Sequence, residues 1–140
     1  MKDGSTGMVL RPAELQWVER GNGASTIPLV TKACGSTSML NGITEFKPGG
    51  AIPLHSHNCE ESVLVLEGEC IAEIDGRQYR LGRHDTTFIP GGVPHRFLNA
   101  SETDLTRIFW TYASVEATRT LITTGETHPI SAEHAGNGAA

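Results

Sequence analysis

Short stretches in which apolar and polar residues alternate occupy most of the chain between residues 27 and 113. This two-residue period is typical of β-strands that bury one face, and no long window shows the helical period instead. The pattern predicts strands over residues 27–33, 38–46, 61–67, 69–75, 78–81, 86–89, 95–99 and 105–112. One short helix is expected over residues 12–20, because Pro12 suits a first helical position and Gly21 suits a stop.

Turn-forming residues separate the predicted strands at close intervals. The chain contains 16 glycines and seven prolines. Asp75-Gly76 is a two-residue hairpin signal, because this pair tolerates the positive φ angles of a type I′ turn. Many short strands joined by tight turns are typical of a β-sandwich or barrel, so we expect an all-β fold.

The length of 140 residues corresponds to a single domain. We divide the chain into an N-terminal segment (1–26), a β-barrel domain (27–113) and a C-terminal segment with a tail (114–140). Residues 1–7 and 131–140 are mainly polar or small and have little to bury. Both short ends are therefore expected to be mobile.

Charge and cysteine content narrow the classes of partner and compartment. The net charge of −5 argues against a nucleic-acid backbone or an anionic membrane as the main partner. No apolar run approaches the length that crosses a bilayer. Cys34, Cys59 and Cys70 are odd in number and have no recurring spacing. They indicate free thiols in a reducing compartment, and we expect a cytoplasmic protein.

The candidate chemistry lies with histidines and one glutamate. His55 and His57 are two residues apart, so on an extended chain they point to the same side, and Glu61 continues that parity. His95 follows a Pro-Gly-rich turn that would begin another strand. Imidazoles and a carboxylate on one face form a set that binds first-row transition metals. The alternatives are an incidental His-x-His pair, a solvated acidic pair at Glu60-Glu61 and a core histidine at His95.

The spacing of these residues resembles the two motifs of the cupin family. The first motif is matched at every interval by Gly49, His55, His57, Glu61 and Gly68, and the second by Pro90, Gly92, His95 and Asn99. One position departs from the pattern. His84 stands where the family usually has a glycine before the aspartate, and Gly82 lies two residues earlier.

The resemblance implies a double-stranded β-helix, the small cupin jelly-roll barrel. It also implies one divalent transition metal held by His55, His57, Glu61 and His95. Nitrogen and oxygen ligands do not distinguish Fe, Mn, Ni, Zn and Cu, since metal supply decides as much as geometry. Gly68 would allow a tight turn, and Gly92 a close backbone passage beside the site.

The pocket wall is inferred from parity and residue type. Phe97 shares the face of His95, and Phe46, Trp110 and Tyr112 are aromatic residues that either line the pocket or belong to the core. Cys59 has the parity of His55 and is either a small buried residue or an alternative soft ligand. Arg96 is expected to face outward, and the remaining histidines, His84, His128 and His134, are expected to be exposed.

The resemblance favours a metal-dependent enzyme that acts on a small organic molecule. A dioxygenase-type oxidoreductase is preferred because the predicted pocket wall is mostly apolar. Two alternatives are kept: a metal-dependent isomerase or lyase acting on a sugar or keto acid, and a non-catalytic small-molecule-binding cupin. No catalytic base can be identified in the sequence. Cupins of this size usually pair, so we expect a homodimer in which residues 27–33 supply a strand.

Overall fold

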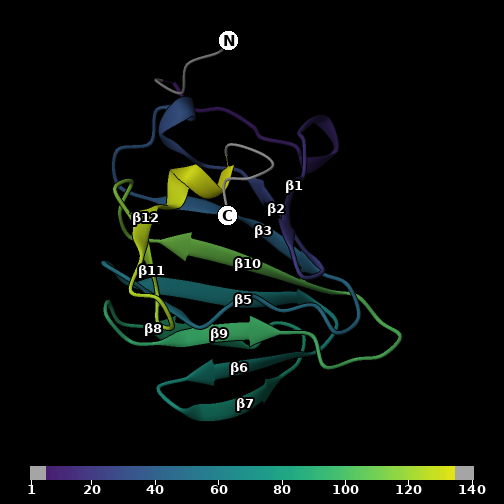
Figure 1. Cartoon of the computed structure of the whole chain (residues 1–140). Helices are drawn as coiled ribbons and strands as arrows, with labels where there is room; N and C mark the ends of the chain where they lie inside the picture. The colour runs from purple at the N-terminus through teal and green to yellow at the C-terminus, as the bar shows by residue number, and fades with distance from the viewer. Residues whose placement is uncertain (1–5, 135–140) are drawn as a thin grey trace.

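Two antiparallel β-sheets face each other in the computed structural model, which describes residues 6–134 (Figure 1). The strands are β1 (Val18–Gly21), β2 (Ala24–Pro28), β3 (Leu40–Phe46), β4 (His55–His57), β5 (Glu61–Glu67), β6 (Cys70–Ile74), β7 (Arg77–Leu81), β8 (Thr86–Ile89), β9 (His95–Leu98), β10 (Thr106–Tyr112), β11 (Thr118–Leu121) and β12 (Thr127–Pro129). One sheet has the order β1-β2-β3-β10-β5-β8 and the other β12-β11-β4-β9-β6-β7. This is the predicted double-stranded β-helix.

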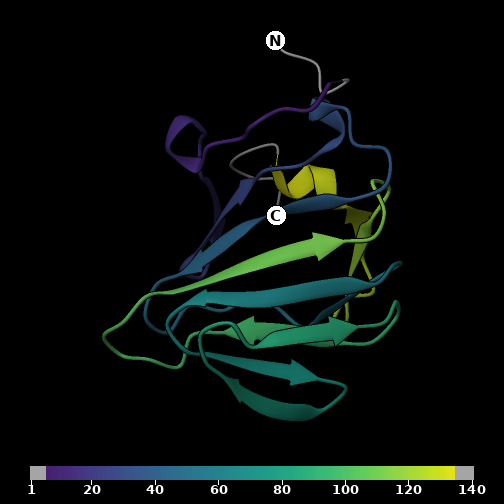
Figure 2. The same ribbon diagram turned by 180° about the vertical axis from the view of Figure 1, so that it is seen from behind.

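The core lies between the sheets because each long strand buries every second residue. β3 and β10 show strict alternation, with Phe46 and Trp110 among their buried positions. β5 buries Glu61, Val63 and Val65, as their shared parity predicted. The view from behind shows β10 and β5 running side by side across the molecule (Figure 2). The predicted all-β pattern is therefore confirmed in its central strands.

Two predicted turns are confirmed. Asp75 and Gly76 have φ angles of 50° and 82°, as a type I′ hairpin requires, and they join β6 to β7. Gly68 has a φ of 77°, and a Cβ atom there would lie only 2.4 Å from the carbonyl oxygen of Leu105. Glycine is therefore needed at position 68 for both its backbone angle and its size.

Strands on both sides of residues 27–113 extend the two sheets. β1 and most of β2 precede this range, while β11 and β12 follow it. The sequence pattern missed β1 and β11 because their inward positions carry Arg20 and Arg119 in place of apolar residues. β4 was also not predicted as a strand, and it is only three residues long.

The predicted helix over residues 12–20 is wrong. Only Pro12–Glu14 forms a turn of 3-10 helix (η1), and β1 begins at Val18. η1 buries none of its residues, and Trp17 beyond it is 39% exposed. A short helix without a buried apolar face gains too little to offset the cost of its first turn.

The predicted strand over residues 27–33 is shifted. β2 ends at Pro28, which has no N–H to donate to a neighbouring strand, and Lys32–Cys34 forms a second 3-10 helix (η2). Ile27 is fully buried, but within β2 it pairs with β3 of the same chain.

The C-terminal segment is ordered further than expected. Ile130–His134 forms a 3-10 helix (η3) that lies over one end of the barrel, with Ile130 and Glu133 buried (Figure 1). The prediction of a mobile end is therefore wrong for residues 131–134. Residues 1–5 and 135–140, which make up most of the two predicted mobile ends, lie outside the described part of the chain.

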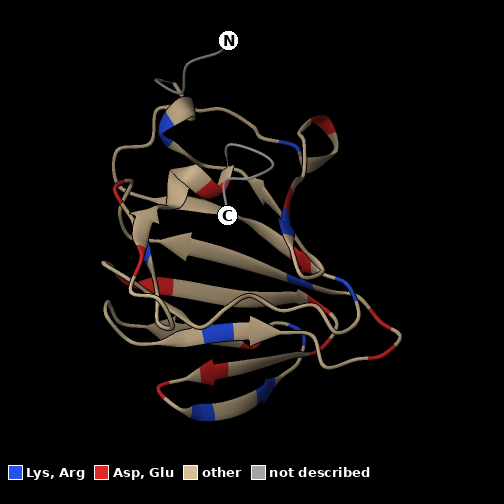
Figure 3. Cartoon of the chain, in the orientation of Figure 1, with Lys and Arg blue, Asp and Glu red and all other residues tan. Residues whose placement is uncertain are grey.

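A charged pair lies on the outer face of the second sheet. Glu73 on β6 lies between Arg96 on β9 and strand β7, which carries Arg77 and Arg80 (Figure 3). Arg96 points away from the barrel interior and makes two hydrogen bonds to Glu73, at 2.9 and 3.0 Å. The three cysteines are free thiols, and no helix in residues 6–134 is long and apolar enough to cross a membrane.

Replacing His84 with glycine is expected to stabilise the protein by about 0.5–1 kcal/mol, which corresponds to roughly 2–4 °C in melting temperature. His84 is exposed and has a φ of 74° in a turn closed by a 3.0 Å hydrogen bond from Asp85 N–H to the Gly82 carbonyl. The third position of such a turn favours glycine.

Urea denaturation of His84→Gly measures this gain. The matched control is Arg83→Gly, which adds a glycine to the same turn at a residue without a positive φ angle and should lower stability. A loss of stability in His84→Gly comparable to that in Arg83→Gly would show that the histidine conformation is not strained.

Candidate metal centre

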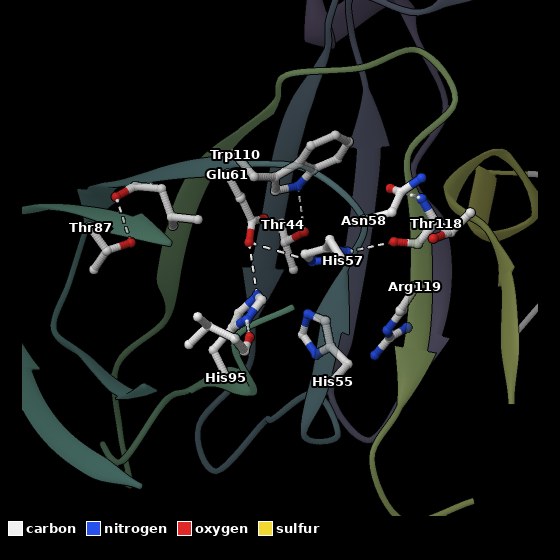
Figure 4. Close-up of polar contacts among 12 residues, drawn as sticks. Thr44, His55, His57, Asn58, Glu61, Thr87, His95, Trp110, Thr118 and Arg119 are labelled. Atoms are coloured by element: carbon white, nitrogen blue, oxygen red, sulfur yellow. Dashed lines mark hydrogen bonds and ion pairs between the residues drawn. The ribbon is translucent and has the colours of Figure 1, made fainter. Parts of the chain in front are cut away.

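Three histidines meet in the barrel interior. His55 and His57 lie on β4, and His95 begins β9, where it stands directly opposite His55. One ligand nitrogen from each ring lies within 4.8 Å of the others. All three residues are at least 96% buried. The structure therefore brings together the three imidazoles that the spacing in the sequence predicted (Figure 4).

Backbone carbonyls hold the three rings in one orientation. The Nδ1 atoms lie 2.7 Å from the Pro53 oxygen for His55, 2.9 Å from the Thr118 oxygen for His57 and 2.8 Å from the Val93 oxygen for His95. A carbonyl only accepts hydrogen bonds, so each Nδ1 carries a proton, and each Nε2 faces the centre of the cluster, where it can bind a metal ion or donate to Glu61. This arrangement is typical of metal-binding histidines.

Glu61 lies against two of the three histidines. Its Oε1 atom is 2.9 Å from Nε2 of His95 and 3.5 Å from Nε2 of His57. Burial acts to raise the pKa of Glu61, but the neighbouring His57 and His95 together lower it well below its usual range. The carboxylate therefore remains charged beside the imidazole nitrogens.

One atom of the cluster has no partner. Among residues 6–134, Nε2 of His57 is buried and accepts no hydrogen bond. An unsatisfied buried polar atom costs about 1–3 kcal/mol, so its presence requires an explanation. A metal ion at this point would satisfy the lone pairs of His57, His55 and His95 together. The donor set and its orientation thus fit a divalent transition metal.

His55 is expected to make the metal-free protein sensitive to mild acid. Burial, together with neighbouring His95, Arg119 and His57, holds the pKa of His55 well below its usual value. Below about pH 6.5 the unfolded chain therefore binds a proton that the folded protein excludes. The free energy of unfolding should fall by up to about 1.4 kcal/mol per pH unit in this range.

Urea denaturation in the presence of a chelator, between pH 7.5 and 5, checks this expectation. The His55→Asn variant removes the titrating ring and should show a shallower fall in stability. An identical slope in both proteins would mean that His55 does not exclude the proton.

A small cavity lies beside the histidines. About 20 Å³ of it is open to water-sized molecules, which is room for about one water. Its wall includes His55, Glu61, Phe97, Trp110 and Tyr112.

The structure separates the predicted wall residues into two groups. Phe97, Trp110 and Tyr112 line the cavity, as their types and parity suggested. Phe46 is fully buried in the core and does not border the cavity, because β3 directs it into the packed layer at the other end of the sheet. Cys59 follows β4, is half-buried and lies outside both the cavity wall and the histidine cluster, so the chain has left the parity of β4 there.

Trp110 is held by contacts on several sides. Its Nε1 atom donates a 2.8 Å hydrogen bond to Thr44 Oγ1, and its ring stacks on His134 of η3 with centroids 5.7 Å apart. Gly42 provides the space, since a Cβ atom there would lie 2.5 Å from the indole. His134 and His128 are half-buried, which corrects the expectation that they are exposed, whereas His84 is exposed as expected.

The motif residues Gly92 and Asn99 form hydrogen bonds with backbone groups of neighbouring segments. Gly92 has a φ of 82° and donates an N–H hydrogen bond of 2.8 Å to the His57 carbonyl. A Cβ atom on Gly92 would meet open space, so the predicted close passage is wrong there and occurs instead at Gly91, beside Cys59. Asn99 lies in the loop after β9 and bonds only to backbone groups.

Sequence reasoning missed a buried charged cluster next to the cavity. Arg119 on β11 and Glu133 on η3 are 4% and 3% exposed and lie 3.0 Å apart. Arg20 on β1 lies 3.1 Å from the same carboxylate. Arg119 pairs in register with His57 across β4 and β11, yet no spacing in the sequence links these residues.

A comparison with known families agrees with the fold and the histidine cluster. A family profile described as a cupin domain matches residues 42–112, which is about half of the chain. This chain belongs to the cupin family. The matched range includes all three clustered histidines and Glu61, so the histidine cluster lies within the matched cupin domain.

Three known proteins illustrate what this chain is similar to. The tetracenomycin polyketide synthase protein TcmJ of Streptomyces glaucescens is 34% identical over 79 residues, which cover 55% of this chain and 53% of that protein. The chain therefore matches about half the length of this curated relative. The polyketide cyclase RemF of Streptomyces resistomycificus has a similar structure, with a TM-score of 0.71, 21% identity and coverage of 88% of this chain and 84% of that one.

An RmlC-like cupin from Shewanella frigidimarina is also similar in structure. Its TM-score is 0.66 at 19% identity, and the match covers 74% of this chain and 87% of that one. At these identities the two structural matches establish the shared fold.

Proposed function

We propose that this chain is a metal-dependent enzyme that cyclises a small, enolisable poly-β-ketone. The observation that carries the proposal is the convergence of three buried Nε2 lone pairs, one of which, on His57, has no partner in the described part of the chain. His55, His57 and His95 would hold the metal, with Glu61 as the fourth ligand. A divalent metal there would polarise a substrate carbonyl and make the adjacent C–H more acidic.

The protein's own residues would orient the substrate and exclude water. Phe97 and Trp110 provide an apolar wall next to the cluster. Tyr112 packs on His57 with ring centroids 4.6 Å apart, and burial raises the pKa of its phenol well above the usual value. Tyr112 therefore keeps its proton at neutral pH and can donate a hydrogen bond to a substrate oxygen.

The similarity to TcmJ and RemF supports a polyketide-like substrate. One relative is a polyketide synthase protein and the other a polyketide cyclase. A linear poly-β-ketone closes a ring when a C–H carbon attacks a distant carbonyl and water is lost. This reaction needs no oxidant, and its substrate differs from the sugar or keto acid of the isomerase or lyase alternative kept from the sequence.

A dioxygenase is the second candidate. The apolar side of the cavity, formed by Phe97, Ile108 and Trp110, favours it because such a wall protects reactive oxygen chemistry from water. The two reactions differ in stoichiometry, since the dioxygenase consumes oxygen and the cyclisation releases only water.

Heptane-2,4,6-trione is a suitable probe because its ring closure with loss of water yields a dihydroxytoluene. We expect the metal-loaded chain to form this product at least about 10-fold faster than the metal-free chain, without oxygen uptake. Liquid chromatography with mass spectrometry and an oxygen electrode measure the two outcomes. Oxygen consumption that depends on the metal would favour the dioxygenase. No reaction from a fully metal-loaded chain would contradict the cyclase.

We also propose that the protein is a homodimer. β2 already pairs with both β1 and β3, so residues 27–33 are not a free strand, and the outer strand β8 is the better candidate for contact. Phe88 on β8 is 63% exposed, which supports an apolar contact at this edge. Light scattering after size exclusion measures the mass. A value near 15.0 kDa, the mass of one chain, would contradict the dimer.

A further inference from the structure

Arg119 is a buried guanidinium that is only partly paired. Its side chain is 4% exposed and Nη1 donates a 3.0 Å hydrogen bond to Glu133, but within residues 6–134 its Nε and Nη2 atoms have no partner. Leaving charged donors unsatisfied in the interior is costly, and the cost is removed when an anion binds them. The side chain extends from β11 toward the ring of His55 (Figure 4).

The two buried arginines beside the cavity, Arg20 and Arg119, share a single carboxylate contact. Glu133 is shared between two guanidinium groups, those of Arg119 and Arg20. The ion pairs of the described residues place Glu61 against His57 and His95 rather than against either arginine. One carboxylate for two buried arginines therefore creates a place for one more negative charge.

Arg119 borders both the inner cavity and a larger cleft outside it. The cleft has a volume of about 280 Å³, and Arg20, Arg96 and Arg119 form part of its wall. Arg96 is already paired with Glu73. The inner cavity holds only about 20 Å³, so a substrate ring must lie in the outer cleft and reach inward with a single polar group.

We propose that Arg119 binds an oxyanion of the substrate, through Nε and Nη2, at the junction of the outer cleft and the cavity beside His55. The guanidinium fork suits a carboxylate, enolate or phenolate oxygen on a planar ring. The inference deepens the proposed function by naming the substrate class, an anionic ring-sized molecule, and to that extent rests on it. Arg119 is then the residue that selects anionic over neutral substrates.

Salicylate and its neutral analogue salicylamide are the probes, and isothermal titration calorimetry on chelator-treated protein measures their affinities. The wild-type chain should bind salicylate at least about 10-fold more tightly than salicylamide. Arg119→Gln should lose this preference by weakening salicylate alone, and Arg119→Lys should retain part of it. Arg107→Gln is the matched control, because Arg107 pairs with Glu45 and Glu67 on the surface. It should bind as the wild type does.

Glu133→Gln tests the same contact in the opposite direction. The Glu133 carboxylate competes with a bound anion for Arg119, so removing its charge should strengthen salicylate binding several-fold. A general loss of structure would weaken binding instead. The proposal is overturned if Arg119→Gln retains wild-type salicylate affinity, if Glu133→Gln weakens it as Arg119→Gln does, or if the wild type does not distinguish the two probes. If Arg119→Gln does not fold, the salicylate affinities of Arg119→Lys and Glu133→Gln test the proposal.

These titrations are separable from the test of the metal site. They use metal-free protein, so Arg119-dependent salicylate binding by a chain that takes up no metal would reject the proposed enzyme and keep the anion site. Normal metal uptake and cyclisation, with salicylate affinity unchanged by Arg119→Gln, would reject the anion site and keep the enzyme.

Discussion

His57→Ala is expected to weaken metal binding by at least about 100-fold. Loss of a hydrogen-bonding partner of a metal-binding histidine already costs 10–100-fold in affinity, and this substitution removes the ligand itself. The Nε2 atom of His57 is buried, makes no hydrogen bond among the described residues and lies 3.5 Å from Glu61 Oε1. Its removal therefore affects metal binding most directly.

Competition with a chelator of known affinity, followed by elemental analysis, measures the loss. A second readout is thermal: metal at a thousandfold excess over its dissociation constant stabilises a folded protein by about 4 kcal/mol, and His57→Ala should lose this gain. His84→Ala is the control, because His84 is exposed and lies outside the cluster. Wild-type metal content in both His57→Ala and His95→Ala would reject the assigned site.

Asn99→Asp is expected to lower the free energy of unfolding by about 3–5 kcal/mol. Asn99 is 1% exposed, and its Nδ2 atom lies 3.1, 3.2 and 2.7 Å from the carbonyl oxygens of Phe46, Lys47 and Asp104. Its Oδ1 atom accepts from Ser101 N–H at 3.0 Å. Aspartate preserves the shape and this acceptor, but it turns the donor into a charged oxygen that faces three carbonyls.

Asn58→Asp provides the matched comparison. Asn58 also donates to one backbone carbonyl, that of Glu116, and accepts from one backbone N–H, that of Thr118, but it is exposed. Water can solvate the new charge there, so the loss should stay below about 1 kcal/mol. Urea denaturation of both variants in a chelator isolates folding from metal binding. Equal, small losses would mean that Asn99 does not hold these loops together.

Much of the barrel could be predicted because its central strands carry their own signal. β3, β5 and β10 alternate strictly, since one face of each packs in the core. The hairpin at Asp75-Gly76 depends on two neighbouring residues and needs no distant contact. The strands β1 and β11 were not predicted, because Arg20 and Arg119 each occupy an inward position and interrupt the alternation in hydrophobicity.

The candidate site also has one part that the sequence predicted and one part that only the structure shows. His55, His57 and Glu61 lie on one short piece of chain, so strand periodicity alone predicts that they share a face. His95 was linked to them through its motif, and the register of β4 and β9 places it opposite His55. Phe46 was misplaced because parity tells which side of a sheet a residue occupies but not how far along the barrel it lies.

The sequence by itself determined the all-β class and the shared face of His55, His57 and Glu61, because both follow from local periodicity and short spacings, and the cupin motif added His95 to the set. Only the tertiary structure decided what surrounds that set. Arg20, Arg119 and Glu133 are far apart along the chain and meet because β1, β11 and η3 close the same end of the barrel. Folding gives two arginines one carboxylate to contact and leaves Nε and Nη2 of Arg119 without a partner among the described residues, and the anionic substrate that we propose rests on this arrangement.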